Sequence, residues 1–139
     1  MKQEVLNLIF DNSYLDYSLN QASDDEIDVL RKKSKVELAQ EYLAFLKEVN
    51  GFELNGMNFY GTEKQDELFV LGVLEQNNFW CTEIAELNDY FLIGDSDLDF
   101  YCYSSGKKRY LILSKGGLVV YNEFDLFDNF LEQIIRSVI

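Results

Sequence analysis

Hydrophobic residues recur along this chain at two different spacings, which separate helical segments from extended ones. Near the start, Val5, Leu6 and Ile9 follow the three- and four-residue intervals of an amphipathic helix, which predicts a short helix over residues 3–10. Residues 12–20 then mix aromatic and polar positions with no clear period. We expect this second segment to form an extended arm on the surface of the core.

Two further helices are expected next, each introduced by a serine followed three residues later by a glutamate. This is the spacing of a capping box, which satisfies backbone N–H groups at the start of a helix. Ser23 and Glu26 precede one apolar stripe, and Ser34 and Glu37 precede a second one that ends at Asn50-Gly51, a left-handed stop signal. The second stripe consists of Leu38, Tyr42, Phe45, Leu46 and Val49.

A hairpin is predicted directly after this helix. Residues 52–54 and 57–60 are short extended runs on either side of Asn55-Gly56, the strongest two-residue hairpin signal in the sequence. Over residues 69–86 the pattern is ambiguous, since its first part suits a strand and the spacing of later leucines suits a helix. Trp80, the only tryptophan, lies in this ambiguous region. It is expected to anchor the core, and a binding-site aromatic is the alternative.

Two strand-like runs on either side of an acidic turn form the centre of the sequence. The run 90–93 is apolar at every position, which is typical of a strand covered on both faces, and Gly94 is expected to end it. The run 98–103 alternates, so that Leu98, Phe100 and Cys102 are expected to share one face. Asp95, Ser96 and Asp97 between the runs are residues that close turns through their short side chains.

The last third of the chain predicts two more strands and a helix. The strands, over residues 109–113 and 118–121, have the spacing of an antiparallel meander. Asn122 or Asp125 is expected to cap a final helix with one wide apolar face, which must pack on the sheet. The pattern as a whole predicts an α+β fold, in a single domain over residues 1–139 with a C-terminal helix on the sheet.

The net charge of −13 changes the picture of what this domain can bind. Between Val36 and Gly106 there are two basic residues against fourteen acidic ones, a net charge of −12 in the middle of the chain. Such a field repels nucleic-acid phosphates and attracts a basic protein. The alternative is that the acidity serves solubility alone.

Two further features bear on location. No segment reaches the roughly 18 consecutive apolar residues of a membrane helix, and residues 1–4 do not begin a secretory signal, so a cytoplasmic location without membrane contact is expected. The two cysteines, Cys81 and Cys102, are expected to be free thiols rather than a disulfide.

Candidate catalytic and metal-binding chemistry is sparse in this sequence. Asp95, Asp97 and Asp99 have the 1, 3, 5 spacing of a calcium loop, but Phe100 replaces its glycine and Gly106 its terminal glutamate. The absence of histidine removes the commonest general base and zinc ligand. We therefore expect no metal, no cofactor and no enzymatic activity. A carboxylate-dependent enzyme is the less favoured alternative, because so many acidic residues create close pairs by chance.

Several short motifs, taken in their order along the chain, resemble those of the SUKH superfamily, which includes the fungal Smi and Knr cell-wall regulators. The motifs are Tyr42-x-x-Phe45-Leu46-x-x-x-Asn50-Gly51, Tyr60-Gly61, Phe91-x-Ile93-Gly94 and, opening the last helix, Glu123-Phe124. The similarity extends from about Leu38 to the C-terminus, which leaves residues 1–35 as an N-terminal helical extension. Ala39 departs from the pattern, because many relatives have proline there, and it suggests a helix start nearer Ser34.

The resemblance implies a non-catalytic domain with a bent, mostly antiparallel sheet flanked by helices. Bacterial members are mostly immunity proteins that neutralise a toxin, often a nuclease, of contact-dependent or polymorphic systems. This implies a cognate basic toxin as the partner, and the acidic middle of the chain supplies the candidate contacts, which are Asp95, Asp97, Asp99, Glu75 and Glu83. A regulatory scaffold that binds cellular proteins is the alternative function.

Overall fold

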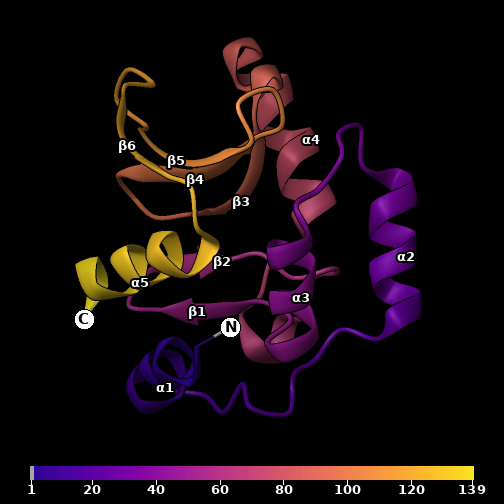
Figure 1. The fold of residues 1–139 in the computed structure, drawn as a ribbon, viewed down its shortest axis with the longest axis vertical. Coiled ribbons are helices and arrows are strands. Elements are labelled where there is room, and N and C mark those ends of the chain that lie inside the picture. The colour runs from indigo at the N-terminus through magenta and orange to yellow at the C-terminus, as the bar shows by residue number, and fades with distance from the viewer. Residues whose placement is uncertain (1) are drawn as a thin grey trace.

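The structure is a computed structural model that describes residues 2–139. Over these residues, five α-helices accompany one six-stranded antiparallel sheet, in which the strands lie side by side in their order along the chain (Figure 1). This confirms the α+β class and the antiparallel meander. The elements are α1 (Gln3–Asn12), α2 (Asp24–Lys33), α3 (Gln40–Glu48), β1 (Phe52–Leu54), β2 (Met57–Phe59), α4 (Val73–Glu83), β3 (Phe91–Asp95), β4 (Asp99–Ser104), β5 (Arg109–Ser114), β6 (Val120–Phe124) and α5 (Phe127–Val138).

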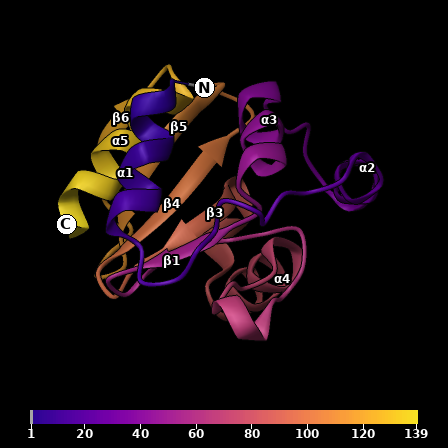
Figure 2. The same ribbon diagram turned by 90° about the horizontal axis from the view of Figure 1, so that it is seen from below.

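The helices cover both faces of the sheet. Helices α1, α3 and α5 lie on one face and α4 lies on the other (Figure 2). On the first face, the ring of Phe127 in α5 lies 5.4 Å from Phe45 of α3 and 5.3 Å from Tyr110 of β5, measured between ring centroids. On the second face, Trp80 of α4 packs edge-on against Phe100 of β4 at 4.9 Å. The expected packing of the C-terminal helix on the sheet is confirmed, and Trp80 packs against the core.

The hairpin signal is confirmed in detail. Asn55 and Gly56 have φ angles of 50° and 86°, the left-handed values that a two-residue hairpin turn requires. They connect β1 to β2, whose Phe52 and Phe59 are paired and stacked 5.5 Å apart. The first 30 residues are also close to expectation, since α1 forms and the arm after it is anchored by Tyr17. The Tyr17 hydroxyl donates to the carbonyl of Leu68.

The second predicted capping box does not form. Ser34 ends α2 instead of starting α3, and its hydroxyl donates to the carbonyl of Val36, 2.8 Å away. Helix α3 begins at Gln40, after Ala39 in extended conformation and without a side-chain cap. The suggestion that α3 starts near Ser34 was therefore wrong, because a serine after a complete helix can satisfy local backbone groups in a turn.

Helix α4 occupies residues 73–83 of the ambiguous segment 69–86, and a 3-10 helix, Ala85–Asp89, follows it. The apolar residues before α4 form no strand, since Val70 takes part only in an isolated bridge. Gly94 does not end β3, which continues to Asp95 through a β-bulge between Leu92 and Gly94. A Cβ at Gly94 would lie 2.7 Å from the carbonyl oxygen of Asn58, so this glycine permits close strand approach. Leu98 lies outside β4 and is 76% exposed, which corrects its placement on the Phe100 face.

The last strand and helix also start later than predicted. Strand β6 covers Val120–Phe124, because Leu118 adopts a left-handed φ of 56° and keeps the turn open for two more residues. Glu123 and Phe124 therefore belong to β6 and do not open the helix. Neither Asn122 nor Asp125 caps α5, whose first residue follows Leu126 without a side-chain cap.

Candidate functional site

Helix α2 lies beside α3, away from the sheet (Figures 1 and 2). Its capping box forms as the sequence predicts: the N–H of Glu26 donates to the Ser23 hydroxyl, and the N–H of Ser23 donates to the Glu26 carboxylate. The first turn is acidic and the last turn is basic, an order that complements the helix dipole. Only Ile27 and Leu30 are buried, so most of α2 faces solvent or the groove described below.

A buried hydrogen-bond network joins α2 to the segment after β2. The Thr62 hydroxyl donates to Oε2 of Glu26 at 3.0 Å and accepts from Nδ2 of Asn50 at 2.9 Å. The N–H of Thr62 donates to Oδ1 of Asn50 at 2.8 Å. The hydrogen bond from the Ser23 N–H lowers the pKa of Glu26, and that from Thr62 lowers it further, while partial burial raises it. The network favours the ionised form of Glu26 and connects α2 to Thr62.

Close backbone approach makes this network possible. A Cβ at Gly61 would lie 2.5 Å from the carbonyl oxygen of Asn50 and 2.9 Å from Val70, which leaves no room for a side chain. Gly51, the predicted left-handed stop, has a φ of 84°. A Cβ at Gly51 would lie 2.7 Å from the backbone nitrogen of Gly61, so neither glycine has room for a side chain. The Asn50-Gly51 and Gly61 motifs therefore set the position of Thr62 and of Glu63 after it.

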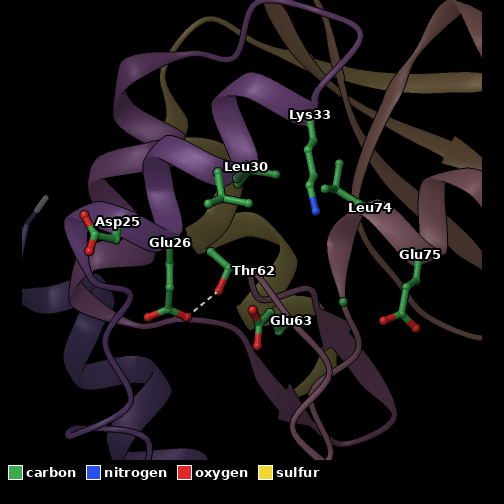
Figure 3. A pocket seen from close by; sticks show the side chains of 10 residues that line it. Asp25, Glu26, Leu30, Lys33, Thr62, Glu63, Leu74 and Glu75 are labelled. Carbon is green, nitrogen blue, oxygen red and sulfur yellow. Dashed lines mark hydrogen bonds between the residues drawn. The ribbon is translucent and has the colours of Figure 1, made fainter.

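A hollow of about 340 Å³ lies between α2 and the start of α4 (Figure 3). Its floor is apolar, and Lys33 extends between Leu30 and Leu74 as its single basic group. Four acidic residues line the hollow against that one basic residue. The lining residues are Asp25, Glu26, Val29, Leu30, Lys33, Thr62, Glu63, Gly72, Leu74 and Glu75.

The comparisons with known proteins identify the family. The model of the SMI1 / KNR4 family (SUKH-1) matches residues 21–133. The chain belongs to this family. The range matched to the SMI1 / KNR4 family begins before Leu38, and it includes α2 and both walls of the hollow. No curated protein matches the sequence.

In this member of the SMI1 / KNR4 family, the five sequence-predicted contact residues do not form one cluster. Of these five residues, only Glu75 lines the hollow. Asp95 ends β3, where its carboxylate accepts from Nζ of Lys115 at 2.7 Å. The side chains of Asp95 and Lys115 are 15% and 23% exposed, and the Lys115 ammonium also lies 4.9 Å from the Trp80 ring centroid. Asp95 is therefore largely covered and already neutralised by Lys115.

The other three predicted residues differ in exposure. Asp97 is exposed in the turn between β3 and β4, and Glu83 is exposed as the last residue of α4. Asp99 is half-buried. Burial of the Tyr121 hydroxyl raises the pKa of that group, and the negative charge of Asp99 raises it further. Among the three aspartates of the turn, Asp97 is the one whose carboxylate is open to a partner.

The hollow brings together Asp25, Glu26 and Glu63, which no sequence pattern predicts as members of a shared site. The pairing of Ser23 with Glu26 marked only a helix start, and nothing in the spacing of Glu63 relates it to α2. The Asn50-Gly51 and Tyr60-Gly61 motifs were the available signal, because they determine where the chain after β2 meets α2.

Three further observations concern the described residues. Within residues 2–139, no three His, Cys, Asp or Glu side chains are grouped so that they could hold a metal ion. Cys81 and Cys102 are free, the first half-buried and the second fully buried. No helix in this range is long and apolar enough to cross a membrane.

Proposed function

We propose that this chain is a non-catalytic immunity protein that binds a basic toxin, such as a nuclease, and neutralises it. The observation that supports this most directly is the acidic hollow, where four carboxylates surround an apolar floor. Lysines and arginines that a nuclease uses on phosphates carry the charge that such a hollow attracts. Membership of the SMI1 / KNR4 family supports the same proposal, through the immunity role that the resemblance implies.

We infer different roles for the residues named from the sequence. Glu75 contacts the partner together with Asp25 and Glu63. Asp97 and Glu83 act at the rim of the interface, where exposed charges raise the association rate more than they lower the dissociation rate. Asp95 and Asp99 contribute little to contacts with the partner. Lys115 neutralises the charge of Asp95, and the half-burial of Asp99 beside Tyr121 limits the access of a partner to its carboxylate.

The experiment starts from the protein encoded next to this gene. That neighbour is co-expressed with the chain, tested for co-purification and tested for toxicity to cells with and without the chain. The test variant combines Asp25→Asn, Glu63→Gln and Glu75→Gln. The control variant combines Asp11→Asn, Glu48→Gln and Glu4→Gln, three exposed carboxylates away from the hollow that give the same net charge.

We expect the test variant to associate about tenfold more slowly at low salt and to protect cells less well, whereas the control variant stays close to the parent. The difference should shrink as ionic strength rises. Equal loss in both variants would contradict the site, because it would mean that net charge alone attracts the partner. A stable complex that leaves the neighbour toxic would contradict the immunity function and favour the regulatory scaffold.

A further inference from the structure

A second hollow adjoins the acidic one along α4. It has a volume of about 280 Å³ and lies between the segment that links α2 to α3 and the outer side of α4. Lys33 and Leu74 line both hollows, so the two share a wall. The two adjacent hollows are together called the groove, which has α2 and the linker after it on one side and α4 on the other.

The two hollows differ in charge, and Lys33 lies at the boundary between them. No carboxylate lines the second hollow, where the charged groups are Lys33 and Lys35 and the polar ones are mainly side-chain amides. Within residues 2–139 neither Lys33 nor Lys35 forms an ion pair, although acidic residues outnumber basic ones by 25 to 12 in the chain. These ammonium groups therefore have no partner within the described fold.

The middle of the groove offers apolar surface. Leu74 of α4 lines both hollows and is partly exposed, and Val29 of α2, which lines the acidic hollow, is 49% exposed. The ten residues of α2 extend for about 15 Å at 1.5 Å per residue. An extended chain covers the same length with about five residues at roughly 3.3 Å each.

We propose that this groove binds an extended segment of a partner protein, about five residues long, with a basic side chain at one end and an acidic one at the other. The basic side chain lies among Asp25, Glu63 and Glu75. A central apolar side chain covers Leu74 and the neighbouring Val29, and the acidic side chain lies in the second hollow, at Lys35 and the adjoining Lys33. This inference deepens the proposed function, because it specifies which part of the toxin the immunity protein holds and in which direction.

Charge complementarity decides between this occupant and others. A uniformly basic segment suits the first hollow but places its charge against Lys33 and Lys35 in the second. A nucleic acid or an anionic membrane meets the opposite conflict at the carboxylates. Only a segment of mixed charge matches both ends, and the matched charges also impose one orientation.

Synthetic peptides test the groove without any toxin. The probe is a capped peptide of arginine, serine, leucine, serine and aspartate, compared with one analogue in which glutamine replaces the arginine and another in which asparagine replaces the aspartate. Binding to the full chain is measured from amide chemical shifts in NMR titrations. We expect changes around Val29, Thr62, Leu74 and Cys81, and an affinity about two- to fivefold lower for each analogue, as for exposed ion pairs.

Two variants assign each preference to one end of the groove. Glu63→Gln with Glu75→Gln is expected to abolish the preference for arginine and retain that for aspartate. Lys33→Gln with Lys35→Gln is expected to do the reverse, and thermal unfolding of each variant checks that it folds like the parent. Preferences that do not separate in this way, no detectable binding, or shifts on another surface would overturn the groove proposal.

The outcomes for the two proposals are distinguishable. Peptide selectivity without any toxin next to the gene retains the groove and rejects the immunity function. A neutralised toxin whose binding is unchanged by Lys33→Gln with Lys35→Gln retains the function and rejects the two-ended groove.

Discussion

The carboxylate of Glu26 accepts a hydrogen bond of 3.0 Å from the hydroxyl of Thr62, 36 positions further along the chain. The same carboxylate caps α2 through the N–H of Ser23. One side chain therefore fixes the start of a helix and also connects that helix to the opposite wall of the groove. Because Asn50 holds Thr62 in turn, the position of α2 against this wall depends on a network that begins at Asn50, just after the end of α3.

The first prediction concerns the pH dependence of this network. Since its hydrogen bonds lower the pKa of Glu26 in the folded state, they stabilise the fold fully above the unfolded pKa of about 4.3, and this contribution is lost as pH falls through the folded pKa. The difference in unfolding free energy between the parent and Glu26→Gln should be largest near pH 7 and shrink below about pH 4. Urea unfolding between pH 3 and 7 measures it.

The control for this series is Glu48→Gln, an exposed residue at the end of α3 for which residues 2–139 offer no hydrogen bond. It removes one negative charge without disturbing the network. A difference curve for Glu26→Gln that follows that of Glu48→Gln would mean that the Thr62 and Ser23 contacts do not stabilise the folded state.

The second prediction is that Gly61→Ala destabilises the protein and weakens any binding in the groove. The new Cβ would lie 2.5 Å from a backbone carbonyl oxygen, so the Asn50 segment must move. We expect a loss of about 1–3 kcal/mol. Gly106→Ala is the matched control, because a Cβ there meets nothing within 4 Å, and it should be nearly neutral. Equal stability of the two variants in urea unfolding would contradict the close approach.

The third prediction concerns the contribution of the Asp95–Lys115 ion pair to stability. Lys115→Met keeps most of the side-chain volume but leaves the largely covered Asp95 carboxylate unpaired, so we expect a loss of about 1–2 kcal/mol. The double variant Asp95→Asn with Lys115→Met should lose less than the sum of the two single changes. Unfolding of the two single variants and the double variant is followed by the fluorescence of Trp80, which contacts the Lys115 ammonium. Strict additivity would show that the pair contributes nothing.

The fourth prediction concerns the two thiols. Burial raises the pKa of the Cys102 thiol well above its usual range and also raises that of Cys81, an effect that the charge of Lys35 partly offsets. Less thiolate is then present at pH 8, so Cys81 should react with iodoacetamide more slowly than a free cysteine. Cys102 should react only after unfolding. Mass spectrometry of the alkylated chain distinguishes the two sites, and rapid labelling of Cys102 in the native protein would contradict its burial.

Local signals were sufficient for much of the fold. The Ser23 and Glu26 pair, the Asn55-Gly56 turn and the apolar run before Gly94 each specify structure through contacts within a few residues, and all three occur as expected. The same local signal can serve a different structure at another position. Ser34 has the same spacing to a glutamate as Ser23, but the chain after α2 turns away before a new helix starts.

The sequence by itself determined the fold class, the acidic character and, through its ordered motifs, the SMI1 / KNR4 family, because hydrophobic period, net charge and turn chemistry are properties of neighbouring residues. Only the tertiary structure decided which carboxylates act together. Lys115 covers Asp95 from 20 positions away, whereas Gly61 and Thr62 bring Glu63 and Glu75 beside α2. Long-range packing controls how exposed each charge is and which charges lie near it, and a linear pattern does not contain that information.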